Sequence, residues 1–117
     1  MMRRIRVIST ENAEHYQWGN GCEGWHLART EDLSVIQELV PAGCREARHY
    51  HKKAEQFFFV LSGTATLEVE GVICQLMPQQ GLHIAAGEKH QLRNEGKEPL
   101  SFIVTSTPPS HGDRIDL

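Results

Sequence analysis

The sequence predicts an all-β domain, a sandwich or barrel built from short antiparallel strands. No segment shows a sustained 3.6-residue apolar period with helix caps, whereas short alternating or apolar stretches recur between turn residues. Turn chemistry marks the breaks between these stretches, at residues 41–43, 62–63, 70–71, 86–87 and 94–96, each of which contains glycine. Many short strands at this spacing are typical of a sandwich or barrel.

Ten strands are expected along the chain, at residues 6–9, 25–28, 33–40, 48–51, 56–61, 65–70, 72–77, 82–85, 90–94 and 100–106. Residues 11–24 are polar and contain glycine, so we expect a loop or short helix packed on the outside. Residues 107–117 contain two prolines and are expected to form a tail past the last strand, which could cross a neighbouring subunit, close the barrel mouth or be a disordered end. The chain is therefore predicted to be one domain over 1–117, with an N-terminal arm at 1–24 and a core at about 25–106.

The strand at 56–61 has two apolar faces. Its side chains alternate between two rows, Gln56, Phe58 and Val60 on one face and Phe57, Phe59 and Leu61 on the other. One row can line the interior, but the other needs a cover, because a large exposed aromatic patch is uncommon in monomers. We expect a homodimer that uses the outer row. The alternative is a cover from the Trp18 and Trp25 region of the same chain.

Composition excludes several classes of protein. With 117 residues, 39% of them hydrophobic, the chain can bury a core without disulfides or a structural metal. A net charge of −3 with mixed signs gives no basic patch, which argues against a nucleic-acid partner. The longest apolar run, residues 57–61, is too short to cross a membrane, and no apolar stretch follows the basic opening residues as in a signal peptide.

The cysteines indicate a reducing compartment. Cys22, Cys44 and Cys74 are odd in number and widely spaced, and none belongs to a CxxC pair. This pattern is typical of free thiols rather than of a disulfide framework. We therefore expect a cytoplasmic protein.

His49 and His51 are the most informative pair of residues in the chain. They flank a single tyrosine on an expected strand, so their side chains share one face, with Cα atoms about 6.6 Å apart. Neutral imidazole is the commonest protein ligand for metals. The pair therefore indicates half of a metal site.

Two longer motifs surround this pair and resemble those of the cupin superfamily. The cupin motif G(X)5HXH(X)3,4E(X)6G is matched at Gly43, His49, His51 and Gly63, and the motif G(X)5PXG(X)2H(X)3N at Gly87, His90 and Asn94. The resemblance implies a double-stranded β-helix, or jelly-roll, barrel with His90 as a third metal ligand. In the second motif Gln79 replaces the first glycine and Ala85 the proline, which affects a turn rather than a ligand.

The fourth ligand position departs from the family pattern. Cupins usually carry a glutamate there, but counting four residues on from His51 and six back from Gly63 gives Gln56. Glu55 fits the shorter spacing that the motif also allows, and the two-residue period makes the two choices exclusive unless a bulge intervenes. We expect Gln56 to face inward, with Glu55 as the alternative. The resemblance then implies one ion held by His49, His51, His90 and Gln56.

The expected donor set suits several metals. Three imidazoles with an amide oxygen and open positions accommodate divalent Fe, Mn, Ni, Co or Zn. Because Gln56 is neutral, the ion would keep its full charge, so metal affinity should be lower than with glutamate.

Two classes of function remain open. The cupin resemblance implies a metal-dependent enzyme, such as a dioxygenase or an isomerase, that acts on a small polar molecule in the barrel. The alternative is a non-catalytic binding or sensing protein, with or without metal. Arg48 and Arg93 adjoin the metal strands and His83 could face the pocket, so these three are the further catalytic candidates, whereas His15, His26 and His111 are expected at the surface.

Overall fold

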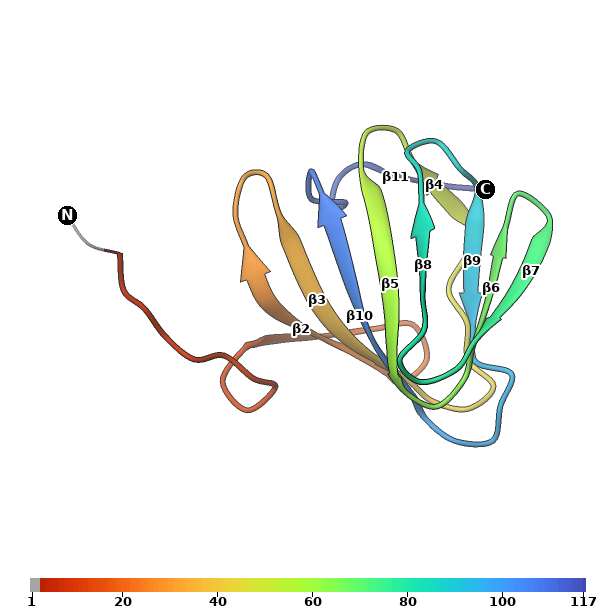
Figure 1. The fold of residues 1–117 in the computed structure, drawn as a ribbon, viewed down its shortest axis with the longest axis horizontal. Helices are drawn as coiled ribbons and strands as arrows, with labels where there is room; N and C mark the ends of the chain where they lie inside the picture. The colour runs from red at the N-terminus through yellow and green to blue at the C-terminus, as the bar shows by residue number, and fades with distance from the viewer. Residues whose placement is uncertain (1–2) are drawn as a thin grey trace.

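The computed structural model describes residues 3–117, which fold into two antiparallel β-sheets without a helix (Figure 1). The strands are β1 (Glu14–Trp18), β2 (Cys22–Arg29), β3 (Ser34–Val40), β4 (His49–His51), β5 (Glu55–Ser62), β6 (Ala65–Val69), β7 (Val72–Leu76), β8 (Gly81–Ile84), β9 (His90–Arg93), β10 (Leu100–Thr107) and β11 (Arg114–Asp116). Within the described residues, nothing forms a helix that is long and apolar enough to span a membrane.

The two sheets wind around each other as a jelly roll. One sheet has the strand order β1-β2-β3-β10-β5-β8 and the other β11-β4-β9-β6-β7. From β3 onward the chain changes sheet at every connection except the β6–β7 hairpin. This alternation is the double-stranded β-helix that the sequence predicts, so the fold class is confirmed.

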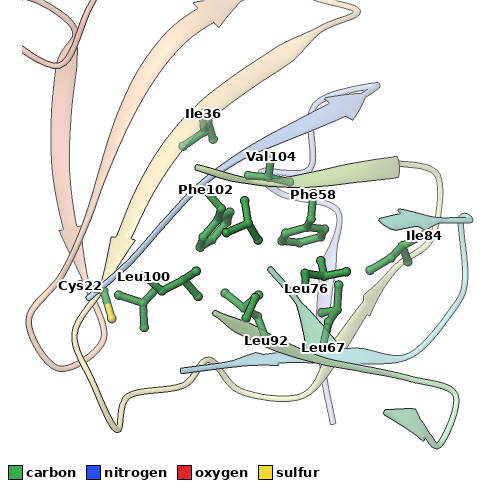
Figure 2. Close-up of a cluster of buried hydrophobic side chains, with 13 residues drawn as sticks. Cys22, Ile36, Phe58, Leu67, Leu76, Ile84, Leu92, Leu100, Phe102 and Val104 are labelled. Carbon is green, nitrogen blue, oxygen red and sulfur yellow. The ribbon is translucent and has the colours of Figure 1, made fainter. Parts of the chain in front are cut away.

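The core fills the space between the sheets (Figure 2). Strand β10 illustrates how the core is built. Buried and partly exposed side chains alternate along this strand, and the buried ones, Leu100, Phe102, Val104 and Ser106, point inward. The buried apolar cluster also includes Phe58 from β5, in ring contact with Phe102 at a centroid distance of 5.6 Å. Burial of this cluster is the main stabilising contribution to the fold.

The N-terminal prediction is wrong in two places. Residues 6–9 form no strand, and residues 11–24, expected as a loop or short helix, form β1 and the start of β2. The hairpin closes through a turn in which Gly19 and Gly21 have φ angles of 54° and 80°. Its strands are largely polar because one face meets solvent, which makes them look like a loop in the sequence.

The C-terminal tail is part of the five-stranded sheet. Residues 114–116 form β11, which pairs with β4. The carboxylate of Asp113 accepts hydrogen bonds from the backbone N–H groups of Lys53 and Ala54, both at 2.9 Å. The segment therefore crosses from β10 in one sheet to β4 in the other at the upper end of the barrel (Figure 1). The sequence predicts no strand after residue 106, and β11 corrects this, because proline content says nothing about such long-range pairing.

The outer aromatic row lies on the surface of the six-stranded sheet. Phe57 is 44% exposed, Phe59 and Leu61 are partly exposed, and the two phenyl rings stack at a centroid distance of 6.5 Å. Trp18, which the alternative prediction used as a cover for this row, packs against the interior cluster instead.

Candidate metal centre

Three histidines from two neighbouring strands converge inside the barrel. His49 and His51 lie two residues apart on β4, and His90 on β9 is the cross-strand partner of His49. One nitrogen from each ring can be chosen so that all three lie within 4.8 Å of one another. The three side chains are 1% to 4% exposed. The shared face predicted for His49 and His51 is confirmed, and the three residues are placed to hold a metal ion.

The protonation of these imidazoles suits metal binding. Nδ1 of His49 donates to the carbonyl of Ala47 at 2.8 Å, and Nδ1 of His90 donates to the carbonyl of Glu88 at 2.9 Å. These bonds leave the Nε2 lone pairs free and orient the rings. Burial lowers the pKa of His49 to about 3 and that of His51 to about 4, and it also lowers the pKa of His90. All three rings are therefore neutral at pH 7.

Gln56 occupies the inward position on β5. Its side chain is 6% exposed and lines the same cavity as His49 and His51. Its amide nitrogen donates to the hydroxyl of Ser106 at 3.0 Å, whereas its Oε1 atom is buried and has no hydrogen-bond partner. Glu55 points to the opposite face, as the two-residue period of a strand requires.

Buried polar atoms without a hydrogen-bond partner indicate whether these residues fit a metal ion. Among the described residues, the buried side-chain atoms without a partner include His51 Nδ1, Gln56 Oε1 and His90 Nε2. Unpaired buried polar atoms are rare because each costs about 1–3 kcal/mol. His51 and Gln56 line one cavity, and His90 belongs to the same histidine cluster, so these atoms mark a place for a ligand. Three neutral imidazoles with an amide oxygen fit a divalent transition metal.

The further catalytic candidates from the sequence lie away from the cavity. His83 is exposed on the outer face, where it bonds the carboxylate of Glu55 at 2.8 Å. Arg48 forms a two-pronged ion pair with Glu68, at 2.6 and 3.1 Å, and Arg93 lies 3.4 Å from a surface glutamate. None of the three lines the cavity, because alternation along β8 and β9 directs His83 and Arg93 to the faces opposite the core.

The cavity beside the histidines has a volume of about 280 Å³. Its wall includes polar residues that the sequence did not indicate, namely Tyr16, Glu38, Glu46, Ser110 and Arg114. His111, which was expected only at the surface, is exposed but also lines this cavity. One signal was available in the sequence: the two-residue period places Glu38 in the inward row of β3, between Ile36 and Val40.

Comparison with known proteins agrees with this geometry. A family profile described as a cupin domain matches residues 35–106. The chain belongs to the cupin family. An uncharacterised protein from Methanocaldococcus jannaschii is 26% identical to this cupin over 81 residues, which are 68% of the chain. The chain spans 65% of the length of that relative.

Two solved structures share the fold of this cupin at low sequence identity. An RmlC-like cupin from Shewanella frigidimarina matches it with a TM-score of 0.83 and 20% identity, over 96% of this chain and 98% of the other. A sugar phosphate isomerase of the cupin superfamily from Silicibacter pomeroyi matches with a TM-score of 0.76 and 19% identity, over 87% and 75% of the two chains. At such identities the likeness establishes the fold.

The cupin motif residues other than histidine hold the strands in place. Gly87 has a φ angle of 86°, which favours glycine, and its N–H donates to the carbonyl of His51 at 2.7 Å. Asn94 is buried, and its amide nitrogen donates to the carbonyls of Val40 and Glu98 at 2.9 Å each. These bonds tie the ends of β9 to neighbouring segments and so help to position His90.

Glu46 brings a carboxyl group close to the histidines. It accepts a hydrogen bond from the N–H of Leu92 at 3.0 Å, and it lies 3.9 Å from His49 Nδ1 and 4.0 Å from Arg114 Nη1. Burial raises the pKa of Glu46 to about 8, although the Leu92 hydrogen bond and the charge of Arg114 lower it. The cavity therefore combines neutral imidazoles with acidic groups.

Proposed function

We propose that this cupin binds a divalent transition metal through His49, His51, His90 and Gln56 and acts on a small polar molecule in the adjoining cavity. The observation that carries the proposal is the convergence of three buried, neutral imidazoles, two of which line a cavity together with Gln56, and the buried nitrogen and oxygen atoms without partners among these residues. Iron, manganese, nickel, cobalt and zinc all suit this donor set.

The surrounding residues limit the kind of molecule that can bind. A volume of about 280 Å³ is below the range usual for drug-sized ligands, so the molecule is small. When bound, the metal would polarise an oxygen atom of that molecule as a Lewis acid. The acidic and hydroxyl groups of the wall can hydrogen-bond its other polar atoms.

The reaction class that we propose is an isomerisation. The supporting points are the carboxyl groups beside the histidines and the likeness in fold to a cupin named as a sugar phosphate isomerase. The neutral amide of Gln56 favours a second candidate, a non-catalytic binding or sensing protein, because weaker metal retention leaves the cavity free for direct ligand binding.

Elemental analysis of protein purified without chelator tests the metal proposal. A stoichiometric transition metal supports it, and protein without metal that fails to take up any added divalent ion refutes it. Oxygen consumption with diols, catechols and β-dicarbonyls then separates the enzyme classes. Bound iron with oxygen uptake would assign a dioxygenase and contradict the isomerase.

Replacing Gln56 by glutamate is expected to tighten metal binding. A carboxylate at the same inward position adds a negative charge next to a dication, which should raise affinity by on the order of tenfold or more. Competition against a chromophoric chelator measures the change. Gln75→Glu is the matched control, because Gln75 is exposed on β7. Looser binding in Gln56→Glu than in the control would contradict an amide ligand.

We also propose that the chain forms a homodimer through the outer row of Phe57, Phe59 and Leu61. Sedimentation equilibrium should give about twice the chain mass of 13.2 kDa. Phe57→Lys should give the monomer, because it places a charge in an apolar contact. Val72→Lys is the control, since Val72 is exposed on the other sheet. A wild-type monomer at micromolar concentration would refute the dimer.

A cytoplasmic location remains part of the proposal. It is supported by Cys22, Cys44 and Cys74, none of which forms a disulfide. Fractionation of cells that produce the protein would test it, and recovery outside the cytoplasm would contradict it.

A further inference from the structure

The cavity has a second polar centre beside the histidines, the hydrogen-bonded pair of Tyr16 and Glu38. The Tyr16 hydroxyl donates to Oε2 of Glu38 at 2.6 Å. Both side chains line the same cavity as His49, His51 and Gln56. A hydrogen bond to a carboxylate at this distance is strong and directional, so it holds the carboxyl group in one orientation at the cavity wall.

The pair depends on a glycine that lies between its members. Tyr16 on β1 is the cross-strand partner of Gly24 on β2, and Gly24 is the partner of Glu38 on β3. The tyrosine ring must therefore cross β2 to reach the carboxylate. A Cβ atom at Gly24 would lie only 2.2 Å from Tyr16 Cζ, so the ring rests on the bare backbone of the glycine.

Glu38 shares the cavity wall with charged or titratable groups from several elements, namely Tyr16 on β1, Glu46 before β4, His111 in the C-terminal segment and Arg114 on β11. Its charge also acts on the Cys22 thiol on β2, while its cross-strand partners Gly24 and Phe102 are uncharged. Burial raises the pKa of Glu38 to about 7, although the hydrogen bond from Tyr16 and the charge of Arg114 lower it. An acid in this range can both accept and release a proton at neutral pH.

Tyr16 has a different protonation behaviour. Burial is the main reason that its pKa lies above the ordinary value, and the charge of Glu38 and the hydrogen bond to it act in the same direction. The phenol therefore stays protonated at neutral pH. It can donate to the carboxylate but does not exchange its own proton with a ligand.

We propose that Glu38 is the proton-transferring residue of the cavity, in the isomerisation of a small α-hydroxy carbonyl compound, and that Tyr16 is its positioning residue. This inference rests on the proposed function, in which the histidine side of the cavity holds the oxygen atoms of the substrate. Glu38 and Glu46 offer carboxyl groups for hydrogen bonds at that end of the cavity, so the part of the substrate facing them carries hydroxyl groups.

The proton transfers balance without an oxidant. The Glu38 carboxylate removes the proton from the carbon that bears the hydroxyl group, the C–H electron pair forms a C=C bond, and the carbonyl electron pair moves to oxygen. The hydroxyl proton passes to the former carbonyl oxygen. Glu38 then returns its proton to the former carbonyl carbon, which leaves the isomeric carbonyl compound and the original carboxylate.

Proton exchange into a probe compound tests the proposal directly. The metal-loaded protein is incubated with dihydroxyacetone in D2O, and loss of the carbon-bound proton signals is followed by ¹H NMR. Glu38→Gln should slow the exchange by about 100-fold or more, because a general base contributes at least that factor. Glu31→Gln is the control and should leave the rate unchanged, since Glu31 is exposed in a loop.

Two variants test the positioning role. Tyr16→Phe removes the donor, and Gly24→Ala displaces the ring that rests on the glycine. Each should slow exchange by about tenfold and move the pH at half-maximal rate upward, because the hydrogen bond that lowers the pKa of Glu38 is lost. Metal content should stay equal to that of the wild type. An unchanged pH profile in both variants would overturn the positioning role.

A second measurement does not need the metal. Infrared difference spectra of metal-free wild type and Glu38→Gln isolate the carbonyl band of the protonated Glu38 side chain. As the pH is raised, we expect this band to disappear near pH 7. Its disappearance near pH 4.5, the ordinary value for a glutamate, would overturn the proposal. Exchange at the wild-type rate in Glu38→Gln, or no exchange in metal-loaded wild type, would also overturn it while leaving the metal centre intact. Failure to bind metal would refute the proposed function, and the infrared titration would still show whether the Glu38 carboxyl group exchanges its proton near neutral pH.

Discussion

Replacing His90 by alanine is expected to lower the affinity for a divalent transition metal by at least about 100-fold. Loss of a residue that only orients a ligand already costs 10- to 100-fold, and His90 supplies a ligand atom itself. Its Nε2 atom is buried and has no partner, and its ring orientation is set by the bond from Nδ1 to the carbonyl of Glu88. Calorimetric titration of metal-free protein with zinc or nickel measures the change.

His83→Ala is the matched control for this experiment. His83 is exposed and bonds Glu55 on the outer face, so its loss should leave metal affinity unchanged. Metal should also stabilise the wild type against urea, by about 2.7 kcal/mol at a concentration 100 times the dissociation constant, and at the same concentration this gain should fall to about 0.4 kcal/mol or less in His90→Ala. Equal metal affinity in the two variants would show that His90 is a structural histidine.

Replacing Glu38 by glutamine is expected to raise the free energy of unfolding at pH 8 by about 3 kcal/mol. Burial raises the pKa of Glu38 from the ordinary 4.5 to about 7 in the folded protein. Between these values the folded state holds a proton that the unfolded state has released, so stability falls as the pH rises through this window. Above pH 7 the ionised Glu38 destabilises the folded protein by about 3 kcal/mol. This value follows because a pKa difference of one between the folded and unfolded states corresponds to 1.36 kcal/mol. Glutamine cannot ionise and still accepts the Tyr16 hydrogen bond.

Urea denaturation at pH 4.5 and pH 8 measures this effect. The stabilisation by Glu38→Gln should be close to zero at pH 4.5 and largest at pH 8. The buried histidines titrate in the opposite direction and cancel in the comparison, because both proteins contain them. Glu46 titrates in the same direction and cancels except for the minor part of its pKa shift that the charge of Glu38 causes. A difference in stability that does not change with pH would contradict a buried carboxyl with a raised pKa.

The histidines that are placed to hold a metal ion could be predicted because their signal is local. His49 and His51 are two residues apart, so the strand period alone places them on one face. His90 lies in a motif of its own, and the cupin resemblance supplied its place in the same site. The choice between Gln56 and Glu55 needed the observed register, in which Gln56 is buried and Glu55 reaches His83 on the outside.

The acidic half of the cavity could not be predicted in the same way. Tyr16 and Glu38 are 22 residues apart and sit on strands that are not neighbours, and their contact requires the ring to cross Gly24. No local pattern encodes such a contact. Tyr16 also lies in a polar stretch that resembles a loop, because its hairpin has one solvent-facing side.

The sequence by itself determined the all-β class, the jelly-roll resemblance and the three histidines, because alternation and motif spacing are properties of neighbouring residues. Only the tertiary structure decided that the first hairpin and the C-terminal segment join the sheets and bring Tyr16 and Arg114 to the cavity. The physical reason is that pairing between distant strands depends on the packing of the whole barrel, which selects among many pairings that the local pattern permits equally.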